Sequence, residues 1–301
     1  MKCRICLSET SSKEFLRAVI SPWIRELSRV RGRLSKLYTC SNCEGGFFSV
    51  VYLEEQMQEL YRDYRGLKYT QIRNKWEKWY TPIYNQAHES ESLVAKRKLV
   101  LEEFLAKNGV NEVYSVLDVG GDIGQYIPYF HSDTKRFVID YSDRKLVNGV
   151  NRVSDLNELQ RVDLIIYAHV LEHVVNPLGN LLDLLQRTRY LYVEVPYGVP
   201  SPSMLRKSRF TQVFALVLSL SPVAWSKFSK PSAGRAQIAQ ILRQSEHLNF
   251  FKETTLRVLA QAAGCGLIVS TNRIPTPDGN VATVIQALFI NELDSAECEY
   301  E

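Results

Sequence analysis

Short apolar runs of strand length alternate with amphipathic segments of helix length along most of this chain. A run at residues 116–119 ends abruptly in a glycine-rich turn, as a buried parallel strand does. Before it, residues 93–107 place apolar side chains at helical spacing and end at Asn108-Gly109. Further strands are predicted at residues 136–140, 162–168, 190–195, 266–271 and 283–290, with a short one before Asp155, and helices at residues 177–187 and 253–263. This alternation predicts an α/β fold with a doubly wound, mostly parallel, seven-stranded sheet.

The segment before this alternation, residues 51–92, is rich in aromatic side chains and predicts a helical connector. Met57, Leu60, Tyr61 and Tyr64 recur at helical spacing, and the aromatic residues that follow are interleaved with Arg and Lys. Interleaved basic and aromatic side chains can bind single-stranded nucleic acid by stacking and phosphate contact. We favour the alternative that these rings pack two domains together or cover a pocket, with solvated cations between them.

The chain has 301 residues, enough to bury a large core, and its 45% hydrophobic and 23% charged residues are typical of a soluble globular protein. The N-terminus lacks the apolar core of a secretory signal, and no apolar stretch of the sequence is long enough to span a bilayer. We therefore expect a cytoplasmic protein. A position at the inner membrane surface stays open because of a basic insertion in the second half of the chain.

The net charge of +4 is small but unevenly distributed. Residues 196–245 contain no Asp or Glu, against seven cations: Arg206, Lys207, Arg209, Lys227, Lys230, Arg235 and Arg243. Apolar side chains lie between these cations, from Phe210 to Phe228. For the insertion at residues 197–245 this pattern favours a helical lid that caps a site and binds an acidic or phosphorylated substrate. Two alternatives are peripheral contact of residues 206–230 with anionic lipid, and a helical excursion packed on the domain.

Four of the six cysteines form two Cys-x-x-Cys pairs, Cys3 with Cys6 and Cys40 with Cys43. In a reducing compartment such pairs indicate a metal rather than disulfides, and four thiolates are the ligand set of a structural Zn²⁺. A closed site of this kind would hold together a small zinc-binding module, residues 1–50. The 33-residue loop between the pairs predicts a helix over residues 22–37. Cys265 and Cys298 have no paired spacing and are interpreted as a core thiol and a tail thiol.

The turn after the strand at residues 116–119 is the main candidate for a binding loop. It combines an acidic residue with three glycines: Asp118, Gly120, Gly121 and Gly124. Glycines let the backbone turn sharply and approach a ligand. Asp140 ends the next strand, 22 residues after Asp118, the spacing at which a carboxylate meets ribose hydroxyls. Asp155 follows the short third strand, where a carboxylate can accept a hydrogen bond from an adenine amine. These patterns predict a nucleotide-type ligand.

Together with the segments downstream, this loop resembles that of class I S-adenosylmethionine-dependent methyltransferases. The segments that carry the resemblance are, in order, residues 116–124, Asp140, residues 163–173 with Asn176-Pro177-Leu178, and residues 192–196. The resemblance covers residues 105–292, and we predict the methyltransferase domain at residues 93–295. It implies that Asp118 and Gly120 approach the methionine portion of the cofactor. It also implies that Asp140 and Tyr141 contact the ribose and adenine, and that His169 lies at the cofactor's inner rim.

Two further features are similar to a subgroup that methylates sugars and surface glycans. The run Glu246-His247-Leu248-Asn249-Phe250-Phe251 precedes a predicted helix, and the N-terminal Cys-x-x-Cys pairs resemble those of zinc-bearing sugar methyltransferases. The resemblance implies a sugar-nucleotide or phosphate-bearing glycan substrate. Asp122 departs from the family pattern, because it stands where the middle glycine of the loop is usual. Asp adopts unusual backbone angles more readily than most residues.

Transfer of a methyl group from a sulfonium to a hydroxyl needs alignment, a dry site and a base. His247 is the first candidate for this base, because it follows the insertion and returns to the carboxyl edge of the sheet; His173 and Glu172 are second candidates. Two other functions stay open. One is a small-molecule methyltransferase of secondary metabolism, and the other, which we disfavour, is a nucleic-acid-binding module with a vestigial cofactor fold. The oligomeric state is not predicted.

Overall fold

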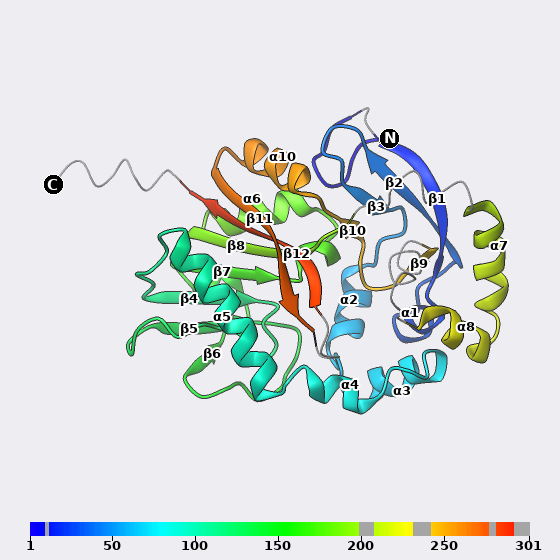
Figure 1. Cartoon of the computed structure of the whole chain (residues 1–301), viewed down its shortest axis with the longest axis horizontal. Helices are drawn as coiled ribbons and strands as arrows, with labels where there is room; N and C mark the ends of the chain where they lie inside the picture. The colour runs from blue at the N-terminus through cyan, green and yellow to red at the C-terminus, as the bar shows by residue number, and fades with distance from the viewer. Residues whose placement is uncertain (10–11, 199–207, 231–241, 277–280, 292–301) are drawn as a thin grey trace.

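The computed structural model describes residues 1–9, 12–198, 208–230, 242–276 and 281–291. The strands of this part of the chain form two β-sheets, a larger one of seven strands and a smaller one of five. Figure 1 shows the larger sheet on the left of the molecule and the smaller one on the right, with a set of short helices between and below them.

The larger sheet has the spatial order β11-β12-β8-β7-β4-β5-β6. Its strands are β4 (Ser115–Val119), β5 (Lys135–Ile139), β6 (Val150–Arg152), β7 (Val162–Ala168), β8 (Thr188–Pro196), β11 (Gly266–Pro275) and β12 (Val281–Ile290). Strands β4 to β8 pair in parallel, whereas β12 runs antiparallel to both of its neighbours, β8 and β11. The predicted mostly parallel seven-stranded sheet is confirmed, although β8, β11 and β12 are longer than predicted.

Side chains on the two faces of this sheet bury separate cores, because successive residues of a strand point to opposite faces. Helix α5 (Glu91–Lys107) covers one face. The strand residues beneath it are Val116, Val138, Leu164, Ile166, Tyr192 and Leu288. Helices α6 (Pro177–Leu185) and α10 (Glu253–Ala263) cover the other face. The strand residues there are Leu117, Ile165, Leu191, Val193, Ile285 and Ala287. Burial on both faces explains the nearly continuous apolar runs of these strands.

The smaller sheet, with the order β10-β3-β2-β1-β9, combines strands from distant parts of the chain. Its N-terminal strands are β1 (Ser12–Ile20), β2 (Leu34–Cys40) and β3 (Gly46–Phe48). Of its edge strands, β9 (Arg243–Gln244) lies at the end of the insertion and β10 (Asn249–Phe250) follows it. Residues 243–244 and 249–250 therefore belong to the same sheet as the N-terminal strands. The domain boundaries expected at residues 50 and 92 stay a prediction.

The helix predicted over residues 22–37 is wrong in its second half. Helix α1 spans only Pro22–Leu27, and Leu34–Cys40 is strand β2. Between them Arg29 and Gly32 have positive φ angles of 54° and 87°, which a right-handed helix cannot contain. Beyond these residues Ser35 and Leu37 are buried in alternation with more exposed neighbours, which is the period of a strand.

Three helices connect the two sheets: α2 (Glu54–Tyr61), α3 (Leu67–Trp76) and α4 (Pro82–Ala87). Most aromatic side chains of this connector pack together with Trp23 of α1 in one core: Tyr52, Tyr61, Tyr64, Tyr69, Trp76, Trp79 and Tyr80. Tyr69 is 0% and Tyr80 2% exposed. Rings buried in this way cannot stack on nucleic acid bases, so the structure supports the packing interpretation.

The described helices of the insertion, α7 (Ser208–Leu218) and α8 (Pro222–Ser229), pack on the N-terminal part of the protein. Ala215 and Trp225 are buried against Val19 of β1. Figure 1 shows both helices at the end of the molecule opposite the larger sheet. The predicted lid stays a prediction. Four residues that the sequence analysis named, three cations of the insertion and the tail thiol, lie outside the described part of the chain: Arg206, Lys207, Arg235 and Cys298.

A buried ion-pair network ties helix α3 to the segment that carries β9. The Arg73 guanidinium donates through Nε to Glu77 at 3.0 Å and through Nη1 to Glu246 at 3.1 Å. Arg243 binds the other carboxylate oxygen of Glu77 at 2.5 Å. Tyr69 donates its hydroxyl hydrogen to Glu246 at 2.5 Å. Both carboxylates are buried, so their charges depend on these partners.

Arg73→Met is expected to destabilise the protein by about 3–5 kcal/mol, because it leaves two buried carboxylates without their shared cation. The free energy of unfolding, obtained from urea denaturation, measures this loss. Lys75→Met is the matched control on the same helix. It removes an exposed ion pair with Glu26 at 2.8 Å and should cost less than about 1 kcal/mol. Equal losses in the two variants would contradict the role of the buried network.

Candidate functional site

The carboxyl ends of β4, β5, β7 and β8 meet at the edge of the larger sheet that faces α2 and β10 (Figure 1). The glycine-rich turn begins there, directly after β4. Gly120 has a φ of 75°, and a side chain on it would meet Cγ2 of Val170 at 2.6 Å. A side chain on Gly121 would lie 2.4 Å from the carboxyl carbon of Asp118. Gly124 closes the turn by donating its N–H to the Gly121 carbonyl at 2.8 Å. Only glycine fits at positions 120 and 121.

Three carboxylates gather at this turn. Asp140 accepts hydrogen bonds from the backbone N–H groups of Asp122 and Ser142, at 2.9 and 2.8 Å. Asp122 has a φ of 52° and turns its carboxylate toward Nη1 of Arg144, at 2.7 Å. Burial raises the pKa of Asp118 to about 7, and the charges of Asp140 and Asp122 add to this shift. A positively charged ligand at this edge would relieve the repulsion.

Tyr141 and Asp155, the other residues predicted to contact ribose or adenine, follow β5 and β6 at the same edge. The Tyr141 hydroxyl donates to Glu54 of α2 at 2.7 Å, and its ring stacks on Tyr61 with centroids 6.4 Å apart. Asp155 caps a short 3₁₀ helix by accepting a hydrogen bond from the backbone N–H of Asn157 at 2.7 Å. Both side chains are exposed.

His169 follows β7 with a φ of 58° and lies between two buried carboxylates. Its Nδ1 is 3.3 Å from Oε1 of Glu172, and its Nε2 is 3.0 Å from Oε1 of Glu194. Burial by itself would lower the pKa of His169, but the hydrogen bonds to these carboxylates raise it to about 9. Arg97 of α5 also binds Glu194, at 2.7 Å. At neutral pH these four side chains therefore carry two positive charges, on His169 and Arg97, and two negative charges, on Glu172 and Glu194.

His173 and His247 complete a cluster with Glu172. Nδ1 of His173 is 3.1 Å from the carbonyl oxygen of Glu246 and 3.0 Å from the hydroxyl of Tyr61. The rings of His173 and His247 pack edge to face, with centroids 4.9 Å apart. Burial lowers the pKa of His247 to about 4, and the neighbouring His173 adds to this shift. The structure thus brings the three predicted catalytic residues together, with the His247 imidazole unprotonated at neutral pH.

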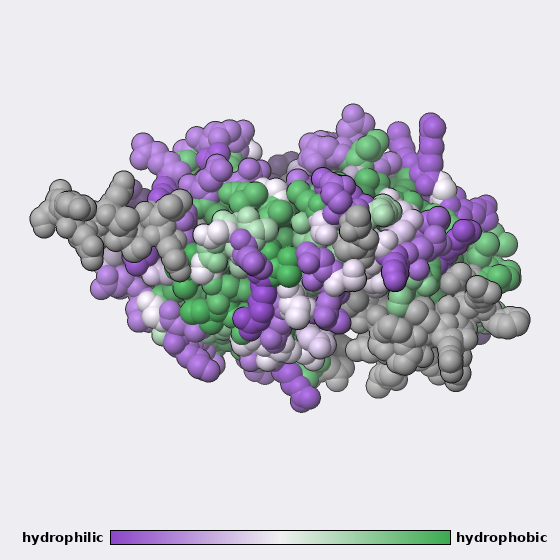
Figure 2. All heavy atoms as spheres, turned by 90° about the horizontal axis from the view of Figure 1, so that it is seen from above, coloured by the Kyte–Doolittle hydropathy of each residue, from purple (hydrophilic) through white to green (hydrophobic). Residues whose placement is uncertain are grey.

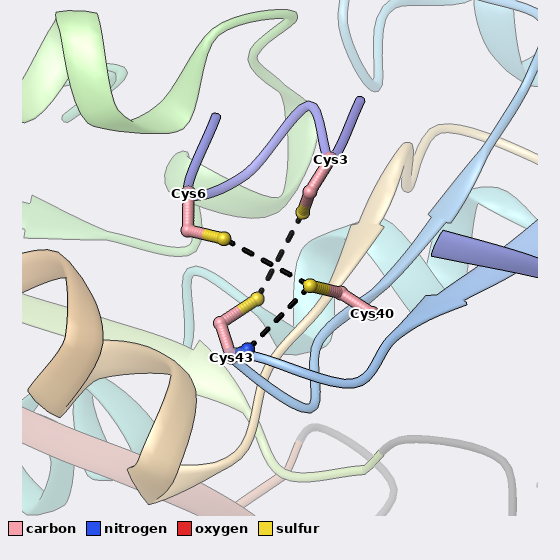
Figure 3. Close-up of side chains that lie close together, drawn as sticks. All are labelled: Cys3, Cys6, Cys40 and Cys43. Carbon is pink, nitrogen blue, oxygen red and sulfur yellow. Dashed lines mark hydrogen bonds between the residues drawn. The ribbon is translucent and has the colours of Figure 1, made fainter. Parts of the chain in front are cut away.

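Four cysteine sulfurs turn toward a common centre in Figure 3. Cys3 and Cys6 lie in the first turn of the chain, and Cys40 and Cys43 lie at the end of β2. The sulfur of Cys3 is 3.9 Å from that of Cys43, and the sulfur of Cys6 is 3.9 Å from that of Cys40. Four sulfurs at about 2.3 Å from a tetrahedral ion lie about 3.8 Å apart. The donor set fits Zn²⁺.

A family model described as a methyltransferase domain matches residues 86–269, which is more than half of the chain. The chain belongs to this methyltransferase family. The match begins just before α5. It includes the turn after β4, the acidic residues Asp118 and Asp140, and residues 169–173. The protein is therefore an S-adenosylmethionine-dependent methyltransferase, as the resemblance in the sequence implied.

Solved structures that are similar to this methyltransferase share little sequence with it. The plantazolicin methyltransferase BamL is 14% identical, with 74% of this chain and 95% of that chain covered and a TM-score of 0.44. The magnesium protoporphyrin IX methyltransferase of Synechocystis PCC 6803 is 14% identical, with 73% and 98% covered and a TM-score of 0.42. The 1,6-didemethyltoxoflavin-N1-methyltransferase of Burkholderia thailandensis is 16% identical, with 69% and 84% covered and a TM-score of 0.41. No curated protein matches the chain.

The charge of this edge fits the cofactor of the family. S-adenosylmethionine is positively charged at its sulfonium and amino groups, and the turn after β4 presents Asp118, Asp122 and Asp140. Glycine at positions 120 and 121 lets the turn pack closely against Val170 and Asp118. The individual contacts predicted for these residues, for Tyr141, Asp155 and His169, stay predictions.

The sequence interpretation missed two residues of the site, Glu194 and Arg97. A signal for Glu194 was present, because a carboxylate interrupts the apolar run of β8, where a buried charge needs a partner. Arg97 gave no such signal, since it is one of several cations on the amphipathic helix α5. Tyr61 was visible only as one of many aromatic residues in the connector.

Asp118→Asn is expected to remove a pH-dependent loss of stability from the cofactor-free methyltransferase. Because the pKa of Asp118 is raised in the folded state, the folded protein keeps a proton that the unfolded chain has released. The wild type therefore loses stability as the pH rises from about 4 to about 7. The loss is at most about 4 kcal/mol, the equivalent of a pKa moved from 3.8 to about 7.

Thermal melting of both proteins between about pH 4 and pH 8 tests this expectation. Asn carries no titrating proton. The melting temperature of the variant should therefore rise relative to that of the wild type as the pH increases from about 4 to about 8. Binding of S-adenosylmethionine to the variant should weaken. Asp133→Asn, at an exposed position, is the control. If the stability of the wild type and that of Asp118→Asn depend on pH in the same way, the raised pKa of Asp118 is refuted.

Proposed function

We propose that this methyltransferase transfers the methyl group of S-adenosylmethionine to a hydroxyl of a sugar or glycan. The acceptor is nucleotide-linked or phosphate-bearing and belongs to surface polysaccharide or glycoside biosynthesis. The observation that carries the proposal is the cluster of Glu172, His173 and His247, which offers an unprotonated imidazole beside a buried carboxylate. A hydroxyl acceptor needs such a group to take its proton. The run at residues 246–251 and the N-terminal cysteine pairs, which resemble those of sugar methyltransferases, favour a sugar.

The cofactor in this proposal lies along the carboxyl edge of the larger sheet. Asp118 and the backbone at Gly120 contact its methionine portion. Asp140 and Tyr141 contact the ribose and adenine, Asp155 the adenine amine, and His169 the inner rim. The cofactor supplies a methyl group bound to a positively charged sulfur, and the protein holds it in line with the acceptor.

The transfer step forms one bond and breaks one. The acceptor oxygen attacks the methyl carbon, the C–S bond breaks, and its electron pair stays on sulfur, which leaves S-adenosylhomocysteine. His247 takes the hydroxyl proton, and the carboxylate of Glu172 stabilises the imidazolium that forms. His169 is not suited to this role, because its neighbouring carboxylates keep it protonated.

Cys3, Cys6, Cys40 and Cys43 would hold a structural Zn²⁺ in this enzyme. Four protein ligands leave no open position for a substrate, so the ion would only hold the N-terminal strands in place. The cysteine loops lie close to the start of α10, where Glu44 pairs with Lys252 at 2.9 Å. Arg4 donates a hydrogen bond to the Leu248 carbonyl at 3.2 Å. The zinc site would therefore also position the segment that carries His247.

The alternative within the enzyme class is a small-molecule methyltransferase of secondary metabolism. The stacked rings of Tyr61 and Tyr141 lie beside His173 and suit a flat aromatic acceptor as well as a sugar ring. The nucleic-acid-binding alternative is disfavoured, because the rings of the connector are buried.

Calorimetry and turnover assays test the proposed reaction. The wild type should bind S-adenosylmethionine, Asp140→Ala should not, and a panel of nucleotide sugars should include one that releases S-adenosylhomocysteine. His247→Ala is expected to lower kcat about 100-fold to 10,000-fold with unchanged cofactor affinity. His131→Ala, whose ring stacks on Tyr114, is the control. Turnover of phenolic acceptors without any sugar turnover would favour secondary metabolism, and full activity of His247→Ala would rule out that base.

Residues 206–230 are proposed to contact an anionic lipid surface, which suits a lipid-linked glycan. Support comes from the apolar side chains of α7, α8 and the turn between them that are 57% to 65% exposed: Val213, Phe214, Val217, Leu220 and Val223. The exposed Lys227 lies four residues after Val223, on the same face of α8. Figure 2 shows hydrophobic surface at the end of the molecule that α7 forms. In the described parts of the chain, no helix has the length and apolar character needed to cross a membrane.

The double variant Phe214→Ser/Val217→Ser should reduce co-sedimentation with phosphatidylglycerol vesicles several-fold, because it removes two of the exposed apolar side chains. Neutral phosphatidylcholine vesicles should bind the wild type more weakly. Leu99→Ser, at a position of α5 that is 53% exposed, is the control. Equal binding of the wild type to both kinds of vesicle would exclude this contact. Equal binding of the double variant and the Leu99→Ser control to phosphatidylglycerol vesicles would exclude it as well. A lipid-independent change in molecular mass would identify a second copy of the chain as the occupant.

A further inference from the structure

The Glu172, His173 and His247 cluster has the composition of a metal site. Each of these residues offers one ligand atom, and the three atoms lie within 4.8 Å of one another. Glu172 and His173 come from the 3₁₀ turn Leu171–His173 after β7, and His247 comes from the segment between β9 and β10. Two imidazoles and one carboxylate are a ligand set that leaves several positions of a divalent transition metal open.

The hydrogen bonds of His173 leave its inner nitrogen free to act as a ligand. Nδ1 of His173 lies 3.1 Å from the carbonyl oxygen of Glu246 and 3.0 Å from the hydroxyl of Tyr61. Both oxygens can accept, so we infer the tautomer in which Nδ1 carries the hydrogen. Nε2 then keeps its lone pair and lies 3.9 Å from Oε1 of Glu172, too far for a hydrogen bond. A histidine that donates one ring N–H to a backbone carbonyl and turns the other nitrogen to an ion is the usual arrangement of metal ligands.

The carboxylate of Glu172 has an unmet requirement. Glu172 is 1% exposed, and its Oε2 has no hydrogen-bond partner in the described part of the chain. Its other oxygen already binds His169, at 3.3 Å. A buried carboxylate oxygen without a partner is unfavourable, and a cation bound to the Glu172 carboxylate would offset this cost.

We infer that Glu172, Nε2 of His173 and His247 bind a divalent first-row transition metal ion, distinct from the four-cysteine site. Ligands at about 2.1 Å from one ion lie at most about 4.2 Å apart, so the side chains need to move inward by about half an ångström. Nitrogen and oxygen ligands suit Mn²⁺, Fe²⁺, Co²⁺, Ni²⁺ and Zn²⁺, so the test below uses protein that carries a single Zn²⁺ per chain, bound by the four thiolates.

The ion also bears on the acceptor, and this part of the inference rests on the proposed function. An acceptor hydroxyl bound at an open position of the ion has a lowered pKa and releases its proton to water. The resulting alkoxide attacks the methyl carbon, and the electron pair of the C–S bond stays on sulfur. His247 then acts as a ligand instead of taking the proton itself.

Titration of the full-length, zinc-loaded protein with MnCl₂, followed by the electron paramagnetic resonance signal of free Mn²⁺, tests the site. The wild type should bind about one Mn²⁺ per chain, and Glu172→Gln and His247→Ala should bind it at least about tenfold more weakly. Glu172→Asp keeps a carboxylate and should retain binding. Asp183→Asn, at an exposed position of α6, is the control. All variants should keep their zinc content and their affinity for S-adenosylhomocysteine, which shows that they are folded.

The absence of Mn²⁺ binding by the wild type, or equal binding by Glu172→Gln, would overturn the inference. An assay of methyl transfer distinguishes a failure of the metal site from a failure of the proposed function. Activity that is lost after chelator treatment at constant zinc content, and restored by MnCl₂, supports the metal site. Full activity after the same treatment overturns the role of the ion but leaves methyl transfer to a hydroxyl intact. If no sugar is methylated under any condition, the acceptor proposal fails, and the Mn²⁺ titration alone decides the metal site.

Discussion

The buried ion pair between Arg73 and Glu246 joins the parts of the chain that build the site. Arg73 belongs to the helical connector and Glu246 to the segment between β9 and β10. The backbone of that segment continues into the site, because Leu248 donates its N–H to the carbonyl of Glu172 at 2.8 Å and the ring of His247 packs on His173. The geometry of the Glu172, His173 and His247 cluster therefore depends on contacts made outside the larger sheet.

The site separates its charges along one edge. Asp118, Asp122 and Asp140 make the turn after β4 negative, which suits a positively charged cofactor. After β7 and β8, His169 and Arg97 neutralise the carboxylates of Glu172 and Glu194. In the cofactor position that we propose, the product has lost the sulfonium charge, so the acidic turn would attract it less strongly than S-adenosylmethionine.

The sequence was sufficient for the larger sheet, because each of its strands has a local signature: a buried apolar run, or an acidic residue at its end. It also identified the four cysteines as a ligand set, and it named His247, His173 and Glu172 as separate candidates for a base, without predicting that they lie together. The smaller sheet was not predictable, since β9 and β10 are only two residues long each and pair with strands about 200 residues away. The helix expected over residues 22–37 failed in its second half, because the backbone takes positive φ at Arg29 and Gly32 and residues 34–40 pair with β1 instead. The partnership of Glu194 with Arg97 likewise exists only in three dimensions.

The composition of the smaller sheet has a consequence for the order of events on the ribosome. Strands β1, β2 and β3 are synthesised first, but Val19 finds its partner Arg243 and Phe47 its partner Asn249 only after most of the chain has been made. Until then the nascent N-terminal strands expose edges on which other chains can pair. All four clustered cysteines are synthesised within the first 43 residues. Early metal capture by these cysteines would hold the three strands together while the rest of the enzyme is translated.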